Sequence, residues 1–129
     1  MSITRNVVER YNLELWNHRR FELGQELLGE QVIRHGPAGR DVLSREEAIS
    51  RVEKLWSTVE HVEFTLVHTV VDGEFCAIVY QAEMCLPGGV NDAIASIEVF
   101  RVVDGRIVEV WNNEHQHGRW PELDEGVSE

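Results

Sequence analysis

The chain has 129 residues, of which 43% are hydrophobic and 27% charged, and its formal net charge is −11. The length predicts a single domain over residues 1–129, with a frayed acidic tail over 121–129. The acidic balance leaves no basic stripe for nucleic acid, and no apolar run approaches the roughly 20 residues that cross a bilayer. Because the charged start MSITRNVVERYN is not a signal peptide, we expect a cytoplasmic protein with no nucleic-acid or membrane partner.

The first half of the chain has helical patterns. Apolar residues at helical spacing predict a helix over residues 4–17 and a shorter one over 21–28 that ends at Gly29. Residues 31–35 have the pattern of a short strand, which the Gly-Pro-Ala-Gly run at 36–39 stops. The Ser-Arg-Glu-Glu run that begins at Ser44 is a capping box and predicts a third helix as far as residue 58.

The second half has strand patterns. Residues 61–71 and 75–86 alternate around Asp72-Gly73, and residues 94–113 form a hairpin around Asp104-Gly105, the strongest short-range hairpin signal. The order predicts an α+β fold in which three N-terminal helices pack on a strongly curved, mainly antiparallel sheet. Such a sheet, covered on its concave side, encloses a conical pocket suited to a small apolar ligand with a few polar anchors.

The two cysteines, Cys76 and Cys85, fall nine residues apart in one predicted strand. Nine residues of strand span about 30 Å, far beyond disulfide reach, and the opposite parity points the side chains to opposite faces. We therefore expect free, buried thiols and a reducing compartment.

Glu98 is the most informative candidate for a functional residue. Strand residues two apart share a face, so Glu98 lies among Ile94, Ser96, Phe100 and Val102, on a largely apolar surface. One interpretation is a carboxylate that meets an arginine, such as Arg34 or Arg101, or reaches solvent. The other is a buried acid with a raised pKa that donates a hydrogen bond to a substrate oxygen.

Four segments carry a family resemblance: ERYNLELWN, VIRHGP, SREEAI and IEVFRVVDGRIVEVWN. On these the chain resembles the nuclear-transport-factor-2-like (NTF2-like) superfamily, and within it the SnoaL-like polyketide cyclases and the ketosteroid isomerases. The resemblance covers nearly the whole chain and implies the cone-shaped cystatin/NTF2-like fold. The superfamily holds enzymes, binding proteins and assembly modules alike, so the fold does not fix the activity.

The ketosteroid isomerase pattern implies three catalytic positions. That family uses a tyrosine and a protonated acid as an oxyanion hole and an aspartate as the base. Tyr11 and Glu98 match the first two positions, whereas the aspartate is absent and His35 is the nearest titratable group. Each has a plainer alternative, because Tyr11 also suits the core and His35 also suits a hydrogen bond within its loop.

Further side chains are candidates for ligand binding. Asn112 ends an apolar strand row and either orients a ligand or closes a strand-end hydrogen bond. His68 lies on an apolar strand face, where a histidine is usually a satisfied core residue. The remaining candidates are predicted to line the core or the pocket: Trp56, Tyr80 and Val110.

The predicted function is cofactor-free acid–base chemistry on an apolar, oxygenated, carbonyl-bearing molecule: cyclisation, isomerisation or dehydration. His35 would move the proton, while Tyr11 and Glu98 would stabilise the enolate. The alternative is a non-catalytic ligand-binding or assembly module that dimerises through its sheet. No metal is expected, because His115 and His117 share a strand face but have no evident third ligand.

Overall fold

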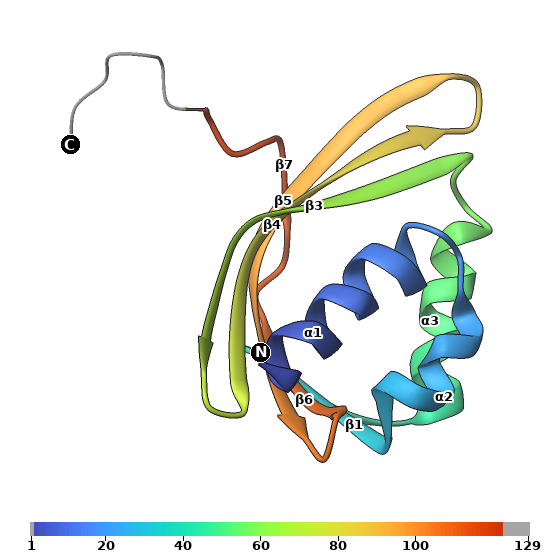
Figure 1. Ribbon diagram of the computed structural model, residues 1–129. Helices are drawn as coiled ribbons and strands as arrows, with labels where there is room; N and C mark the ends of the chain where they lie inside the picture. The colour runs from blue at the N-terminus through green and yellow to red at the C-terminus, as the bar shows by residue number, and fades with distance from the viewer. Residues whose placement is uncertain (1, 123–129) are drawn as a thin grey trace, which may run out of the picture.

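The computed structural model describes residues 2–122 and has a layer of helices on one face of a curved sheet (Figure 1). The helical elements are α1 (Ile3–Arg10), the π-helix η1 (Tyr11–Trp16), the 3-10 turn η2 (Phe21–Leu23), α2 (Gly24–Leu27) and α3 (Arg45–Trp56). The strands are β1 (Leu28–Gly36), β2 (Gly39–Ser44), β3 (His61–Asp72), β4 (Phe75–Leu86), β5 (Val90–Val103), β6 (Arg106–Asn112) and β7 (Gln116–His117). The prediction of an α+β fold with a curved sheet is confirmed.

The sheet is mixed, with strand order β2-β1-β6-β5-β4-β3 and with β7 added beside β5. β3 to β6 form the predicted antiparallel meander, whereas β1 runs parallel to β6. The sequence analysis missed β2, because this edge strand is mostly exposed and has no alternating apolar pattern. The second helix lies over the predicted residues but consists of the 3-10 turn η2 followed by the single turn α2, and β1 begins at Leu28 rather than at residue 31.

The hairpin between β5 and β6 forms at the predicted turn. Asp104 and Gly105 both have positive φ, 51° and 75°, which is the type I′ geometry that matches the twist of the two strands. The turn pairs Val102 with Ile107, and a bulge between Arg101 and Val102 then shifts the register by one residue, so that Glu98 of β5 pairs with Asn112 of β6. The turn and the bulge together therefore decide which polar groups meet on the concave face.

Polar contacts fasten the helix layer to the sheet. The side chain of Asn17 exchanges two hydrogen bonds with the backbone of Phe64 in β3, at 2.7 and 3.0 Å. The indole of Trp56 in α3 donates to the carbonyl of Trp16 at 2.9 Å. Thr4 donates to the carbonyl of Gly73, in the turn between β3 and β4. These contacts hold α1, η1 and α3 over the concave face, around a core that includes Leu15, Val52 and Phe100.

Both cysteines are free, as predicted, but the predicted burial holds for Cys76 alone, because Cys85 lies near the end of β4 and is partly exposed. Of the predicted tail over residues 121–129, residues 123–129 lie outside the described part of the chain. Between residues 2 and 122, no helix has the length and apolar character needed to span a membrane.

The capping box of α3 gives a first test of the fold. The Ser44 side chain accepts from the Glu47 amide at 3.1 Å, and the Glu47 side chain accepts from the Ser44 amide at 2.8 Å. We expect Ser44→Ala to lower the free energy of unfolding by about 1 kcal/mol, because an amide at the helix start loses its partner. Urea denaturation measures this.

Ser50→Ala is the matched control, because Ser50 is exposed in the middle of the same helix. Alanine favours the helix slightly more than serine, so the stability should stay the same or rise. Equal losses in the two variants would show that the cap does not stabilise α3.

Candidate functional site

A cavity of about 180 Å³ lies between the helices and the concave face of the sheet. Its polar lining comes from three layers of the fold, with Tyr11 and Asn12 from η1, Arg51 from α3, and Arg34, Tyr80, Glu98 and Asn112 from the sheet. Its apolar lining consists of Trp16, Leu55, Phe64 and Ile94, and His115 joins it from the segment after β6. Such a partly enclosed space, in which polar groups converge beside apolar walls, is typical of a small-molecule site.

Glu98 points into this cavity from the middle of β5, as strand alternation requires. Asn112, directly opposite on β6, donates from Nδ2 to Oε2 of Glu98 at 2.6 Å. Nη2 of Arg34 lies 3.7 Å from the same oxygen, and the Glu98 side chain is only 12% exposed. The structure thus combines parts of both interpretations of Glu98: the carboxyl is buried, and it also lies beside an arginine.

Burial raises the pKa of the Glu98 carboxyl above its ordinary value of 4.5, while Arg34, the Asn112 hydrogen bond and Arg51 act in the opposite direction. The desolvation of the charged form therefore outweighs the two cations and the amide. A carboxyl with a raised pKa keeps its proton at higher pH, and a protonated carboxyl can donate a hydrogen bond.

Two tyrosine hydroxyls share the cavity with Glu98. Tyr11 is the first residue of the π-helix, and its ring meets Phe100 edge-on with centroids 6.0 Å apart. Burial raises the pKa of Tyr11, and burial followed by the charge of Glu98 raises that of Tyr80. Both hydroxyls therefore stay protonated at neutral pH and can act as hydrogen-bond donors. π-helical turns of this kind are frequent at functional sites.

His35 does not join this group. Alternation along β1 turns Arg34 to the cavity and His35 to the outer face of the sheet. There its ring stacks on Trp111, with centroids 4.9 Å apart, and its Nε2 lies 2.8 Å from Oε2 of Glu109. The structure therefore brings Tyr11 and Glu98 together but places the predicted base outside their cavity.

The predicted ligand-binding residues divide in the same way. Asn112 and Tyr80 line the cavity. Trp56 and Val110 instead belong to the buried core, where the Trp56 indole holds η1 in place. His68 is exposed, because a register shift between Leu66 and His68 reverses the side-chain alternation of β3. An inserted residue of this kind has no signature in the apolar pattern.

Several cavity residues were not among the predicted site residues, and two that carry an ionisable side chain are Arg51 and His115. Arg51 was detectable, because it lies one helical turn from both Ala48 and Leu55, beside the apolar stripe of α3. His115 lies in an irregular segment whose path depends on tertiary contacts, so no local pattern predicts its place.

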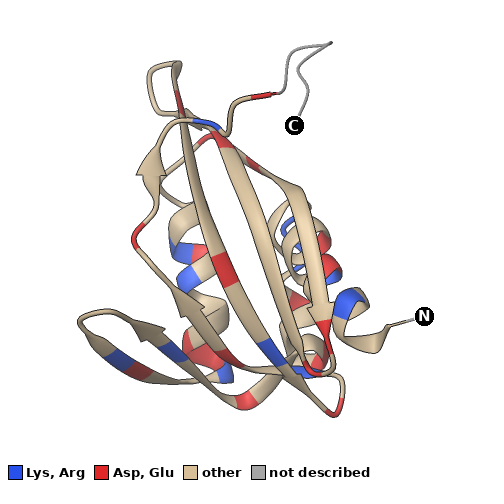
Figure 2. Cartoon of the chain, turned by 90° about the vertical axis from the view of Figure 1, so that its left-hand side faces the viewer, with Lys and Arg blue, Asp and Glu red and all other residues tan. Residues whose placement is uncertain are grey.

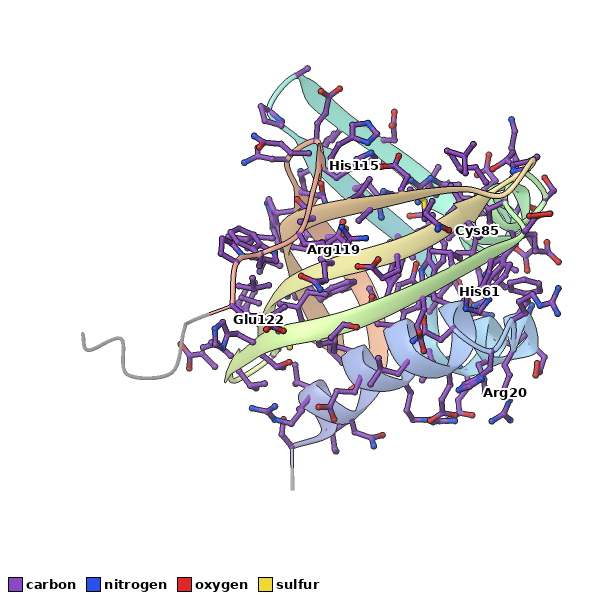
Figure 3. The ribbon with its side chains drawn as sticks, turned by 90° about the horizontal axis from the view of Figure 1, so that it is seen from above. Arg20, His61, Cys85, His115, Arg119 and Glu122 are labelled. Carbon is purple, nitrogen blue, oxygen red and sulfur yellow. The ribbon has the colours of Figure 1, made fainter. Side chains whose placement is uncertain are left out.

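That C-terminal segment crosses the sheet and carries both His115 and Arg119 (Figure 3). Its short strand β7 pairs with Ile94 and Ala95 of β5. Arg119 donates two hydrogen bonds of 2.6 Å to Glu83, and the Trp120 indole donates to the carbonyl of Tyr80 at 2.9 Å. These contacts hold His115 at the rim of the cavity.

The residues that the structure describes, 2–122, contain no group of three or more His, Cys, Asp or Glu side chains arranged to hold a metal ion. The rings of His115 and His117 lie 6.2 Å apart, and Nδ1 of His117 is 3.0 Å from Oδ2 of Asp92. The cavity offers one carboxyl, two tyrosine hydroxyls, two amides, two guanidiniums and an imidazole for chemistry.

Comparison with known proteins gives one family and one shared fold. The model of the SnoaL-like domain matches residues 8–110. A protein assigned as a polyketide cyclase from Acidithiobacillus ferrooxidans has a TM-score of 0.76 at 15% identity, over 86% of this chain and 87% of that one. No curated protein matches the chain.

Two other solved structures widen the range of similar proteins. An LEH-like epoxide hydrolase from M. tuberculosis has a TM-score of 0.72 at 17% identity, over 86% of this chain and 81% of that one. An NTF2-like protein from Burkholderia pseudomallei has a TM-score of 0.72 at 16% identity, over 87% and 90%. At these identities the three structures establish the shared fold.

The raised pKa of Glu98 has a consequence for stability. The folded state keeps the Glu98 proton to higher pH than the unfolded state, so stability is lost as the pH rises above about 4.5 through the folded pKa. Glu98→Gln removes this loss. We expect the free energy of unfolding of the variant, relative to wild type, to increase from about pH 4 to about pH 7 in urea titrations.

Glu109→Gln is the control with the opposite sign. The hydrogen bond from His35, aided by Arg101, lowers the pKa of Glu109, so its carboxylate contributes stability above the unfolded pKa and loses it in acid. This variant should lose stability relative to wild type as the pH rises. Slopes of the same sign for both variants would contradict the assignment for Glu98.

Proposed function

The chain belongs to the SnoaL-like domain family, and on that basis we propose that its cavity performs acid–base chemistry on a small, oxygenated, carbonyl-bearing molecule without a cofactor. The reaction class is cyclisation, isomerisation or dehydration, in which a proton next to a carbonyl is removed. The observation that carries the proposal is the buried Glu98 carboxyl, which shares an enclosed cavity with the Tyr11 hydroxyl.

In this proposal Tyr11 and protonated Glu98 donate hydrogen bonds to the substrate oxygen on which negative charge develops. Donors aimed at such an oxygen inside a water-poor site stabilise the transition state by several kcal/mol, because they need no reorganisation. Asn112 holds Glu98 in place through its 2.6 Å hydrogen bond. The pair therefore acts as an oxyanion hole formed by two elements, η1 and β5.

The proton acceptor in this proposal is His115 rather than His35. His115 lines the cavity, whereas His35 is bonded to Glu109 on the outer face. An imidazole is suited to the task, because its ordinary pKa lies close to neutral pH. The names of two structural relatives, a polyketide cyclase and an epoxide hydrolase, add support for a substrate rich in oxygen.

Hydrogen–deuterium exchange at the α-carbon of a panel of small cyclic ketones tests the proposal. Tyr11→Phe and Glu98→Leu should each lower the enzyme-dependent exchange rate by about 100-fold, because each removes one donor to the enolate oxygen. His115→Ala should lower it by about 100-fold or more, because it removes the base. Mass spectrometry or proton NMR follows the exchange.

His35→Ala is the matched control, since it removes a histidine from the opposite face of the same sheet. Its exchange rate should equal that of the wild type. A loss in His35→Ala without one in His115→Ala would reverse the assignment of the base. An absence of exchange across the whole panel in the wild type would favour a binding module instead.

We also propose that two copies of the chain pair through the outer face of the sheet. Seen from that side, few charged positions interrupt the strands (Figure 2). Phe75 is 42% exposed and Ile97 is 50% exposed, and Trp111 lies between the ring of Phe75 and that of His35. Water-exposed apolar side chains gathered on one face are typical of a protein interface.

Sedimentation velocity tests this pairing. The wild type should sediment as a dimer and Ile97→Lys as a monomer, because a charge in an apolar interface loses its hydration without gaining a partner. Ile3→Lys, at an even more exposed apolar position on α1, is the control and should stay dimeric. A monomeric wild type would exclude the pairing.

A further inference from the structure

The charge of the cavity is opposite to that of the molecule. The chain as a whole has 23 acidic and 12 basic residues, counting only Lys and Arg as basic. Yet the cavity is lined by the two arginines Arg34 and Arg51 and by one carboxyl, Glu98. The lining therefore keeps a positive excess even when Glu98 is ionised, and a larger one when it is protonated.

Arg34 has hydrogen-bonding capacity to spare. Its guanidinium has five donors, and the nearest anionic oxygen is that of Glu98 at 3.7 Å, beyond hydrogen-bond distance. No hydrogen bond joins the Arg34 side chain to any other of the described residues 2–122. The Glu98 oxygen that it faces already accepts from Asn112. The guanidinium of Arg34 is thus available to bind a ligand.

Arg51 approaches the same space from α3. It lines the cavity and also an outer groove beside Glu47 and Lys54, so it lies at the rim. Arg34 and Arg51 line the same cavity, and desolvation and then the charge of Arg34 lower the pKa of Arg51, because like charges disfavour each other. An anion between them would relieve both effects, because it supplies the missing opposite charge.

The rest of the cavity is aromatic and small. Trp16 stacks on Phe64 with centroids 4.8 Å apart, and Phe64 stacks on Tyr80 at 5.5 Å. The volume of about 180 Å³ compares with the roughly 150 Å³ of an apolar cavity that binds benzene. The walls therefore suit one planar or nearly planar ring with short substituents, and exclude a fused polycyclic molecule.

We propose that the ligand is a monocyclic carboxylic acid whose carboxylate bridges Arg34 and Arg51 while its ring lies along Phe64 and Tyr80. This deepens the proposed function, because it names the substrate class of the same site. A second oxygen on the ring would then face Tyr11 and Glu98. A planar carboxylate fits the two forks and leaves room for the ring, whereas a tetrahedral phosphate or phosphonate needs more space.

Calorimetric titration of the full chain with paired probes tests this class. The probes are benzoate, cyclohexanecarboxylate and 2-oxocyclohexanecarboxylate, each with its neutral amide, together with phenylphosphonate and 2-naphthoate. At least one monocyclic acid should bind about tenfold or more tightly than its amide, because the acid gains charge-assisted hydrogen bonds. This advantage should shrink as the salt concentration rises, whereas 2-naphthoate should bind more weakly than benzoate.

Arg34→Gln and Arg51→Gln should each remove most of the preference for the acid and leave amide binding within about twofold. The matched controls are Arg40→Gln in β2 and Lys54→Gln in α3, cations close to the two arginines in sequence but outside the cavity lining. Both should keep the preference. Arg51 is exposed on its helix, so Arg51→Gln tests the proposal even if Arg34→Gln does not fold.

The proposal is overturned if no acid of the panel binds more tightly than its amide, if phenylphosphonate exceeds benzoate, or if the control variants lose the preference equally. These results are separate from those for the reaction. Ketone exchange that depends on Tyr11 and Glu98 without any preference for acids would retain the proposed function and reject this substrate class. Acid binding through the arginines without any ketone exchange would retain this substrate class and reject the proposed function.

Discussion

The burial of one carboxyl group on the concave face of a sheet is the constraint on which the rest of the site depends. Glu98 is held there by backbone pairing on both sides, to Ile78 and Asn112, so it cannot leave the cavity without breaking the sheet. An unpaired charge in such a place is strongly unfavourable, and the fold meets this with an amide donor, nearby guanidiniums and a raised pKa. Each of these partners is also a group that can bind or polarise a ligand.

The same arrangement explains why polar groups gather at this point rather than elsewhere in the core. Once Glu98 occupies the cavity, an apolar filling would leave its oxygens without partners, which costs more than leaving space for water or ligand. Arg34 and Arg51 then lower the cost of ionisation but repel each other. The site thus keeps a balance in which neither charge state is fully satisfied by the protein alone, and this is typical of functional rather than purely structural positions.

Sequence patterns predicted the architecture because its determinants are local. The Asp104-Gly105 turn, the Ser44 capping box and the alternation in β4 each act within a few residues, and each has the expected structure. The residues of the site were predicted less completely. Side-chain alternation along each strand and packing between distant segments decide which residues line the cavity. A single step of alternation separates Arg34 in the cavity from His35 outside it, and the bulge in β3 moves His68 to the surface. Strand alternation identified Glu98 and the resemblance to known families added Tyr11, whereas no local signal locates His115.

The contacts that hold the segments around the cavity decide from which side a ligand enters it. The helix layer is fastened by partly buried hydrogen bonds, Asn17 to Phe64 and Trp56 to Trp16, which would have to break together. The C-terminal segment is fastened by the exposed ion pairs of Arg119 with Glu83 and of His117 with Asp92, by the pairing of β7 with β5, and by the partly buried Trp120 indole. The exposed pairs contribute about 0–1 kcal/mol each and weaken with salt, so the β7 pairing and the Trp120 hydrogen bond hold this side more firmly than the ion pairs do. Because His115 belongs to that segment, opening it would withdraw the imidazole, and closing it over a ligand would return the imidazole to the cavity.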